Sequence, residues 1–269
     1  MRNEGNECTM HVYPTCGHGW GFRDAAHGFP YHEQMLNDLT CWLNGFKAPK
    51  EDAIRVACIG NSITDGFGIG MAPVKGYPAQ LQKKLGDGYE VKNFGVSART
   101  MMNKGDLPYM NELAWRDAKA FNPSVVVIKL GTNDTKTHNW TKGAEEFQQS
   151  MQAMIDTLKA LPSKPKIYLC SPIPALKDSW TIKDSVIVNG EMPIIQKLAK
   201  KNKCSFVDLH TGFTFADMMQ RDGIHPTAKG AGKIADIIYT ALTTPEKELK
   251  AAAKAAAKKS AKKMSAKKK

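Results

Sequence analysis

The sequence has no long apolar run and no visible leader. Its 269 residues are 42% hydrophobic and 24% charged, a composition that excludes a disordered or collagen-like polymer. No apolar stretch approaches the roughly 18 residues that a membrane span requires. The polar start lacks a basic region followed by an apolar segment, so no signal peptide is visible. The frame as it stands predicts a cytoplasmic protein, and truncation of the N-terminus would instead allow a secreted or periplasmic form.

Metal and disulfide patterns are missing as well. The six cysteines are scattered, with no C-x-x-C pair and no Cys/His spacing typical of a zinc site, so we expect no metal. Cys58 and Cys170 lie in apolar runs that predict core strands, where a free thiol packs as a small hydrophobe. Any disulfide would therefore join two of the other four cysteines, Cys8, Cys16, Cys41 and Cys204.

Acidic residues are absent from the C-terminal end. Residues 249–269 contain nine lysines and no acid, which accounts for most of the net charge of +12 and leaves a mildly basic body. We interpret the Lys/Ala-rich tail, residues 245–269, first as a solubilising low-complexity extension. The alternative is that it binds a polyanion such as nucleic acid or an anionic polysaccharide. The oligomeric state cannot be predicted from these features.

Short β-branched runs alternate with longer amphipathic segments from Ile54 onward. The predicted strands are Ile54–Gly60, Tyr89–Gly95, Val125–Gly131, Lys166–Ser171 and Cys204–Leu209. The predicted helices are Tyr77–Leu85, Tyr109–Phe121, Ala144–Leu161, Ser185–Asn202 and Thr227–Leu242. Strands that are nearly continuous in apolar residues and separated by helices indicate a parallel sheet covered on both faces. We predict a doubly wound, flavodoxin-like α/β domain at residues 49–244, with a five-stranded parallel sheet.

Residues with catalytic potential follow several of these strands, where doubly wound sheets bind ligands. Ser62 lies in the turn GNSITDG after the first strand, Gly95 ends the second, and Asn133 lies in GTND after the third. Asp222 precedes His225 by three residues in DGIHP, so its carboxylate can hold Nδ1–H while Nε2 faces the serine. Each residue alone has a structural alternative: a cap, a turn glycine, an Asx-turn or a structural histidine.

Together, these four blocks resemble the GDSL or SGNH hydrolase family of esterases and lipases across about residues 54–242. The resemblance implies a nucleophile Ser62 with Asp222 and His225, and an oxyanion hole formed by Ser62, Gly95 and Asn133. It implies a serine esterase that works through an acyl-enzyme and requires no cofactor. Two residues depart from the family pattern: Asn61 stands where Asp is most frequent, and Ala98 stands where many members have Gly.

Three stretches, KGYPAQLQKKLG, NKGDLPY before the third strand and THNW after GTND, are similar to the family branch that removes acetyl groups from carbohydrates. This branch includes acetylxylan esterases and sialate O-acetylesterases. That similarity predicts a small acylated substrate or an acetylated polysaccharide, bound with the help of Asn139, Trp140 and Trp180. Aromatic packing of the loops onto the body is an equally good interpretation of the tryptophans. The rival functions are a lipid-type acylhydrolase or thioesterase, and a non-catalytic protein that binds polyanions through the lysine tail.

Residues 1–48 carry a separate resemblance. A predicted strand, a glycine-rich turn with His18 and an amphipathic helix are similar to the C-terminal end of an α/β-hydrolase of the polysaccharide-esterase type. No nucleophile elbow precedes them in this sequence, so we do not expect His18 to be catalytic. We interpret the segment as a truncation remnant of a two-domain esterase or as a fusion scar.

Overall fold

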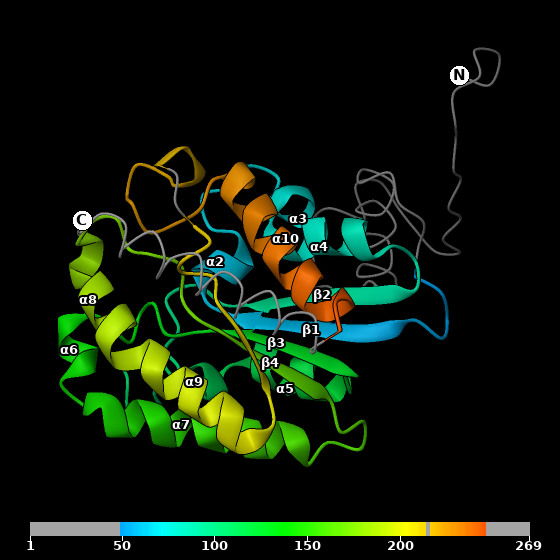
Figure 1. The fold of residues 1–269 in the computed structure, drawn as a ribbon, viewed down its shortest axis with the longest axis horizontal. Helices are drawn as coiled ribbons and strands as arrows, with labels where there is room; N and C mark the ends of the chain where they lie inside the picture. Colours follow the sequence, from blue (N-terminus) through cyan, green and yellow to red (C-terminus); the bar gives the residue numbers. More distant parts are fainter. Residues whose placement is uncertain (1–48, 214–215, 246–269) are drawn as a thin grey trace, which may run out of the picture.

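The structure, a computed structural model, describes residues 49–213 and 216–245. Five parallel strands form one sheet through the middle of the described part (Figure 1). Across the sheet they are β2 (Tyr89–Gly95), β1 (Ile54–Gly60), β3 (Val125–Lys129), β4 (Lys166–Cys170) and β5 (Ser205–Val207). This order, with β1 paired to both β2 and β3, confirms the predicted doubly wound sheet. The topological switch point lies between β1 and β3.

Helices cover both faces of the sheet (Figure 1). On one face lie α2 (Ser62–Asp65), α3 (Ala72–Lys75), α4 (Tyr77–Leu85) and α10 (Ala228–Thr243). On the other lie α5 (Leu113–Ala120), α7 (Gly143–Lys159) and α9 (Met192–Asn202), with α6 (Thr137–Trp140) and α8 (Asp184–Val186) at one end of this layer. Short 3₁₀ turns occur at Tyr109–Asn111, Ser179–Thr181 and Ala216–Met218.

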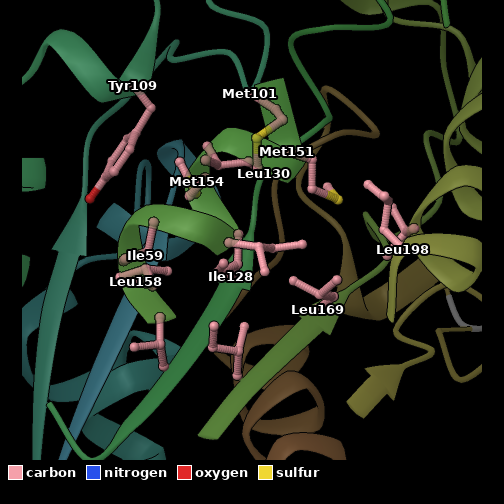
Figure 2. Close-up of a cluster of buried hydrophobic side chains, with 14 of the residues drawn as sticks. Ile59, Met101, Tyr109, Ile128, Leu130, Met151, Met154, Leu158, Leu169 and Leu198 are labelled. Carbon is pink, nitrogen blue, oxygen red and sulfur yellow. The ribbon is translucent and has the colours of Figure 1, made fainter. Parts of the chain in front are cut away.

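The strands divide their side chains between two hydrophobic clusters. In β3, Val126 and Ile128 face one cluster and Val127 faces the other, as the period of two requires. Figure 2 shows the first cluster, in which strand residues such as Ile128 pack against Met154 and Leu158 of α7. Burial on both faces explains why the central strands β1 and β3 are mostly apolar, and it makes the sheet a rigid frame for residues beyond its edge.

Two predicted helices are interrupted in the structure. The one predicted at Tyr109–Phe121 is a 3₁₀ turn followed by α5, because Glu112 between them is extended (φ −81°, ψ 154°). The Tyr109 hydroxyl donates to the Phe94 carbonyl, which ties that turn to the end of β2. This tertiary contact holds the turn against β2, and the predicted helix is therefore broken at Glu112.

The helix predicted at Ser185–Asn202 contains a π-helical turn, Ile187–Glu191, between α8 and α9. Met192 N–H donates to the Ile187 carbonyl five residues earlier, and Pro193 follows at the start of α9. Proline has no N–H to donate, so the helical ladder cannot continue unchanged through Pro193. The widened turn carries Glu191, which is fully buried beneath the site described below.

Candidate active site

Ser62 begins α2 at the carboxyl end of β1 and is 8% exposed. Asn61 caps this short helix, with its Oδ1 accepting from Ile63 N–H at 3.2 Å. The preceding Gly60 has no room for a side chain, because a Cβ there would lie 1.9 Å from Thr64 Oγ1 and 2.8 Å from the Lys129 carbonyl. The tight turn therefore depends on glycine at this position and holds Ser62 against the sheet edge.

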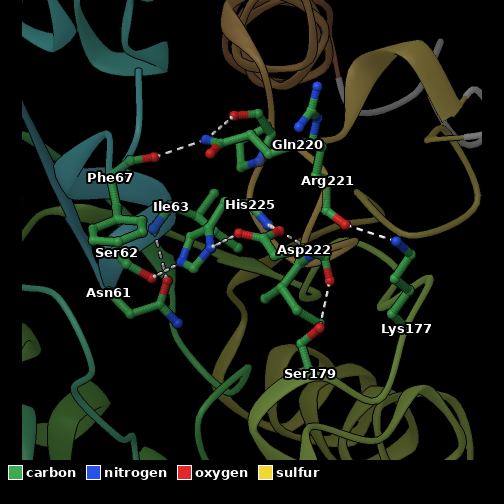
Figure 3. A network of polar contacts seen from close by, with 12 residues as sticks. Asn61, Ser62, Ile63, Phe67, Lys177, Ser179, Gln220, Arg221, Asp222 and His225 are labelled. Carbon is green, nitrogen blue, oxygen red and sulfur yellow. Dashed lines mark hydrogen bonds and ion pairs between the residues drawn. The ribbon is translucent and has the colours of Figure 1, made fainter. Parts of the chain in front are cut away.

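The loop after β5 brings an imidazole to the serine (Figure 3). Ser62 Oγ lies 2.8 Å from His225 Nε2, and His225 Nδ1 lies 2.8 Å from Asp222 Oδ2. Asp222 Oδ1 accepts the N–H groups of Ile224 and His225 at 2.8 and 2.9 Å. The structure thus joins the three predicted triad residues in one hydrogen-bonded chain.

The electrostatics of Asp222 fit this arrangement. Partial burial raises the pKa of the carboxyl, but the backbone N–H groups of His225 and Ile224 and the His225 ring outweigh it, so the net pKa lies below the ordinary value. An ionised Asp222 can hold the Nδ1–H tautomer and stabilise an imidazolium. His225 Nε2 is then free to accept a proton from Ser62.

The predicted oxyanion residues behave differently from one another. Asn133 faces the same pocket as Ser62, and its Nδ2 donates one hydrogen to the Arg99 carbonyl at 3.1 Å, which leaves a second hydrogen for a ligand. Gly95 is outside the pocket lining, and its N–H donates to Asn93 Oδ1 at 2.8 Å. It lies where a Cβ would be 2.2 Å from Asp65 N, so Gly95 allows β2 to pack against α2. The geometry does not support Gly95 as a donor.

Ala98 takes the place expected of Gly95. It lines the pocket, three residues farther along the chain, in a left-handed conformation (φ 68°). Within residues 49–213 and 216–245, the N–H groups of Ser62 and Ala98 have no hydrogen-bond acceptor. The sequence N-F-G-V-S-A could have indicated this position, because the chain must leave β2 before its N–H groups can turn toward a ligand. Gly95 was the wrong donor to predict, since it still belongs to the strand.

The pocket beside Ser62 has a volume of about 260 Å³. Its lining combines the catalytic candidates with apolar and aromatic side chains and a single lysine: Ser62, Phe67, Ser97, Ala98, Thr132, Asn133, Lys136, Trp180, Ile182, Ile224 and His225. Two exposed aromatic rings flank the imidazole, with centroids 4.7 Å (Phe67) and 5.6 Å (Trp180) from that of His225. Phe67 and Trp180 are 50% and 55% exposed, so both can contact a ligand. Phe67, an apolar residue between two glycines, was not predicted.

The other two predicted substrate contacts are structural. Asn139 is 1% exposed and its side chain binds Asp106 N–H, Asp106 Oδ1 and the Asn133 carbonyl. Trp140 packs on Phe147 and over Gly190, with ring centroids 6.1 Å apart in the first pair. Both predictions were wrong because α6 turns these side chains toward the body, where Asn139 supports the loop that carries Asn133.

The remaining sequence features concern the cysteines, membrane spans, metal sites and the two ends of the chain. Cys58 and Cys170 are buried free thiols, as expected of core strands. Over the described ranges, no helix is long and apolar enough to cross a bilayer, and no three His, Cys, Asp or Glu side chains are grouped to hold a metal. The predictions for residues 1–48, including His18, and for the lysine tail beyond residue 245 lie outside the described residues.

Two acetylxylan esterases, one known by its sequence and one by its crystal structure, are similar to this chain. A curated acetylxylan esterase of Xylanibacter ruminicola is 55% identical over 260 residues, which cover 90% of this chain and 53% of that protein. The chain thus spans about half the length of the curated relative it matches. The crystal structure of the acetyl xylan esterase AlAXEase aligns with a TM-score of 0.55 and 27% identity, covering 70% of this chain and 99% of that one.

Two further matches concern the fold and the family. A carbohydrate acetylesterase from Sinorhizobium meliloti aligns with a TM-score of 0.59 at 22% identity, over 70% of this chain and 97% of that chain, and shows the same fold. The GDSL-like Lipase/Acylhydrolase family matches residues 58–233, a range that includes Ser62, Asn133, Asp222 and His225. This chain belongs to the GDSL-like lipase/acylhydrolase family.

Proposed function

We propose that residues 49–244 form a serine esterase domain that removes O-acetyl groups from carbohydrate. The observation that carries the proposal is the hydrogen-bonded chain Ser62–His225–Asp222 at the rim of a pocket that also presents hydrogen-bond donors. The acetylxylan esterase relative supports the same chemistry for the matched half of its length.

In this mechanism, Ser62 Oγ attacks the ester carbonyl while His225 Nε2 takes the hydroxyl proton. Asp222 holds the imidazole and offsets the charge that His225 gains. The proton then passes to the leaving sugar oxygen, and the acetyl group remains on Ser62. A water molecule, deprotonated by His225, attacks the acyl-enzyme in turn and releases acetate and the free serine.

Negative charge on the carbonyl oxygen requires fixed donors in both steps. We assign this role to the backbone N–H groups of Ser62 and Ala98 and to Asn133 Nδ2. Donors held in place before the reaction need no reorganisation, and losing one typically costs about 3 to 4 kcal/mol in the transition state. The packed sheet edge and the Asn139 bonds behind Asn133 supply this rigidity.

The pocket supports a small acyl group and a sugar leaving group. A volume of about 260 Å³ accommodates an acetyl ester together with part of one sugar ring. Trp180 and Phe67 offer faces on which a sugar ring can stack beside His225.

The test is acetate release from acetylated xylan, with a long-chain ester as the comparison substrate. We expect rapid acetate release that falls by about 10⁴-fold or more in Ser62→Ala. Ser124→Ala is the matched control, because Ser124 is exposed at the amino end of β3, and it should behave as the wild type. Hydrolysis of the long-chain ester alone would replace the carbohydrate substrate by a lipid-type one, and inactivity on both would refute the proposal.

A further inference from the structure

Lys129, the last residue of β3, is fully buried directly behind the site. Burying an ammonium group is costly unless it is paired and hydrogen-bonded. Replacing a buried ionic group by an apolar side chain of similar size is often neutral or stabilising. A lysine at the centre of this sheet therefore calls for an explanation other than stability.

The contacts of Lys129 lie on the two turns that carry the reaction. Its Nζ donates to Thr132 Oγ1 at 2.9 Å and to Asn61 Oδ1 at 3.4 Å. Asn61 immediately precedes Ser62, and Thr132 immediately precedes Asn133. One ammonium group thus links the turn of the nucleophile to the turn of the oxyanion amide, across the switch point between β1 and β3.

A buried carboxyl group lies behind the same loop. Glu191 is fully buried, and among the described residues neither of its oxygens has a hydrogen-bond partner. A Cβ on Gly131 would lie 2.7 Å from Glu191 Oε2, so this carboxyl packs directly on the loop that leads to Asn133. The groups whose charges act on Lys129 are the Glu191 carboxylate and the Cys170 thiol on β4. Glu191 in turn is acted on by the charges of Asp134 and Lys129.

The two charges depend on each other. Burial lowers the pKa of Lys129 to about 7, and the facing Glu191 carboxylate opposes this shift. Burial likewise raises the pKa of Glu191, and the charge of Asp134 adds to that rise while Lys129 opposes it. Because Asn61 is a neutral acceptor, it adds no charge to the group formed by Lys129, Glu191 and Asp134. An aspartate at position 61 would add a second acid beside Lys129.

We propose that Lys129 is a positioning residue that holds Ser62 and Asn133 in register through Asn61 and Thr132, with Glu191 as its buried counter-group. The inference rests on the proposed esterase function and deepens it. Lys129 does not touch the substrate and moves no proton. It acts on the distance between the nucleophile and the oxyanion donor, which both the acylation and the deacylation steps require.

The experiment compares Lys129→Met/Glu191→Gln with the wild type, using p-nitrophenyl acetate. The double variant removes both charges, so neither is left buried alone. We expect kcat to fall by about 10- to 100-fold, because a small misplacement of reacting groups has effects of this order. KM should stay within about twofold, since both chemical steps slow together, and the melting temperature should not fall.

The matched control is Gln82→Met, which removes a buried polar network at the opposite end of the sheet. Gln82 binds Gly86, Tyr89 and Val91 near the start of β2. This variant should lower the melting temperature and leave the kcat of the folded protein unchanged. A kcat that is unchanged in the double variant would overturn the proposal, and so would a fall in kcat that is accompanied by a lower melting temperature.

Thr132→Val provides a second test if the double variant does not fold. It removes the Oγ1 acceptor of Lys129 and keeps the size of a side chain that also lines the pocket, so we expect a severalfold lower kcat with KM within about twofold and the wild-type melting temperature. A wild-type kcat in Thr132→Val would also overturn the proposal. A wild-type protein that does not hydrolyse p-nitrophenyl acetate would instead refute the esterase function, so the two failures can be told apart.

Discussion

At the scale of single residues, two asparagines near the site differ in what their side chains face. Asn133 presents an amide to the pocket, whereas Asn93 accepts the Gly95 N–H outside it. We predict that Asn133→Ala lowers kcat by about 10²- to 10³-fold, as expected for a lost oxyanion donor. Asn93→Ala makes the same chemical change and should alter kcat by no more than a few fold. Equal losses in both variants would contradict the assignment of Asn133 as the oxyanion amide.

Asp222 gives a prediction about pH and stability. Its pKa in the folded protein lies below the ordinary value, so the folded state binds fewer protons at this carboxyl than the unfolded state does around that value. The resulting stabilisation is complete at pH values above the ordinary pKa of Asp and is lost as the pH falls through the lower, folded pKa. Urea unfolding should therefore show wild type more stable than Asp222→Asn at neutral pH, with the difference shrinking in acid. A constant difference would contradict the assignment.

Residue-scale prediction from the sequence succeeded where one loop fixed the geometry. Asp222 and His225 share a short loop, so their pairing followed from spacing alone. The prediction of Asn139 and Trp140 as substrate contacts failed because the sequence shows that residues lie near the site, but not which side of a short helix faces the body. Phe67 was not predicted at all. Trp180 was placed at the pocket, as its position in the sequence suggested.

At the scale of elements, the sequence predicted the sheet better than the helices. The bounds of β1, β2 and α4 match the prediction, because apolar strands end where glycine or a polar turn begins. The helices near Glu112 and Pro193 are broken by a tertiary contact and by a missing N–H, respectively. Pro193 could have indicated the second break from sequence, whereas the bond from Tyr109 to Phe94 could not have been foreseen.

The turn between β1 and α2 is the element whose geometry is most constrained. Gly60→Ala would place a methyl group 1.9 Å from Thr64 Oγ1 and 2.8 Å from the Lys129 carbonyl. We expect a loss of about 1 to 3 kcal/mol in unfolding free energy, as for overpacked interiors, together with reduced esterase activity. Gly88→Ala, where no atom lies within 4 Å of the added group, should change neither. Chemical denaturation monitored by tryptophan fluorescence would compare the two variants, and tolerance of Gly60→Ala would show that the turn does not require glycine.

At the scale of the whole molecule, residues 49–213 and 216–245 contain the five-stranded parallel sheet and the residues proposed for catalysis. The fold class could be predicted because alternating strands and helices allow few topologies. The order of the strands then brings residues from the ends of β1, β3 and the loop after β5 to one edge. The predictions for residues 1–48 and for the lysine tail stay predictions, since they fall outside the described residues.

The central claim is that Ser62 carries the acyl group. Its most direct test is mass spectrometry of the protein after brief reaction with p-nitrophenyl acetate and an acid quench, followed by mapping of the modified peptide. We predict the mass of one added acetyl group on the peptide containing Ser62, and none in Ser62→Ala. Acetate release by the wild type without any acetyl group on Ser62, or with the label on another residue, would contradict the acyl-enzyme mechanism.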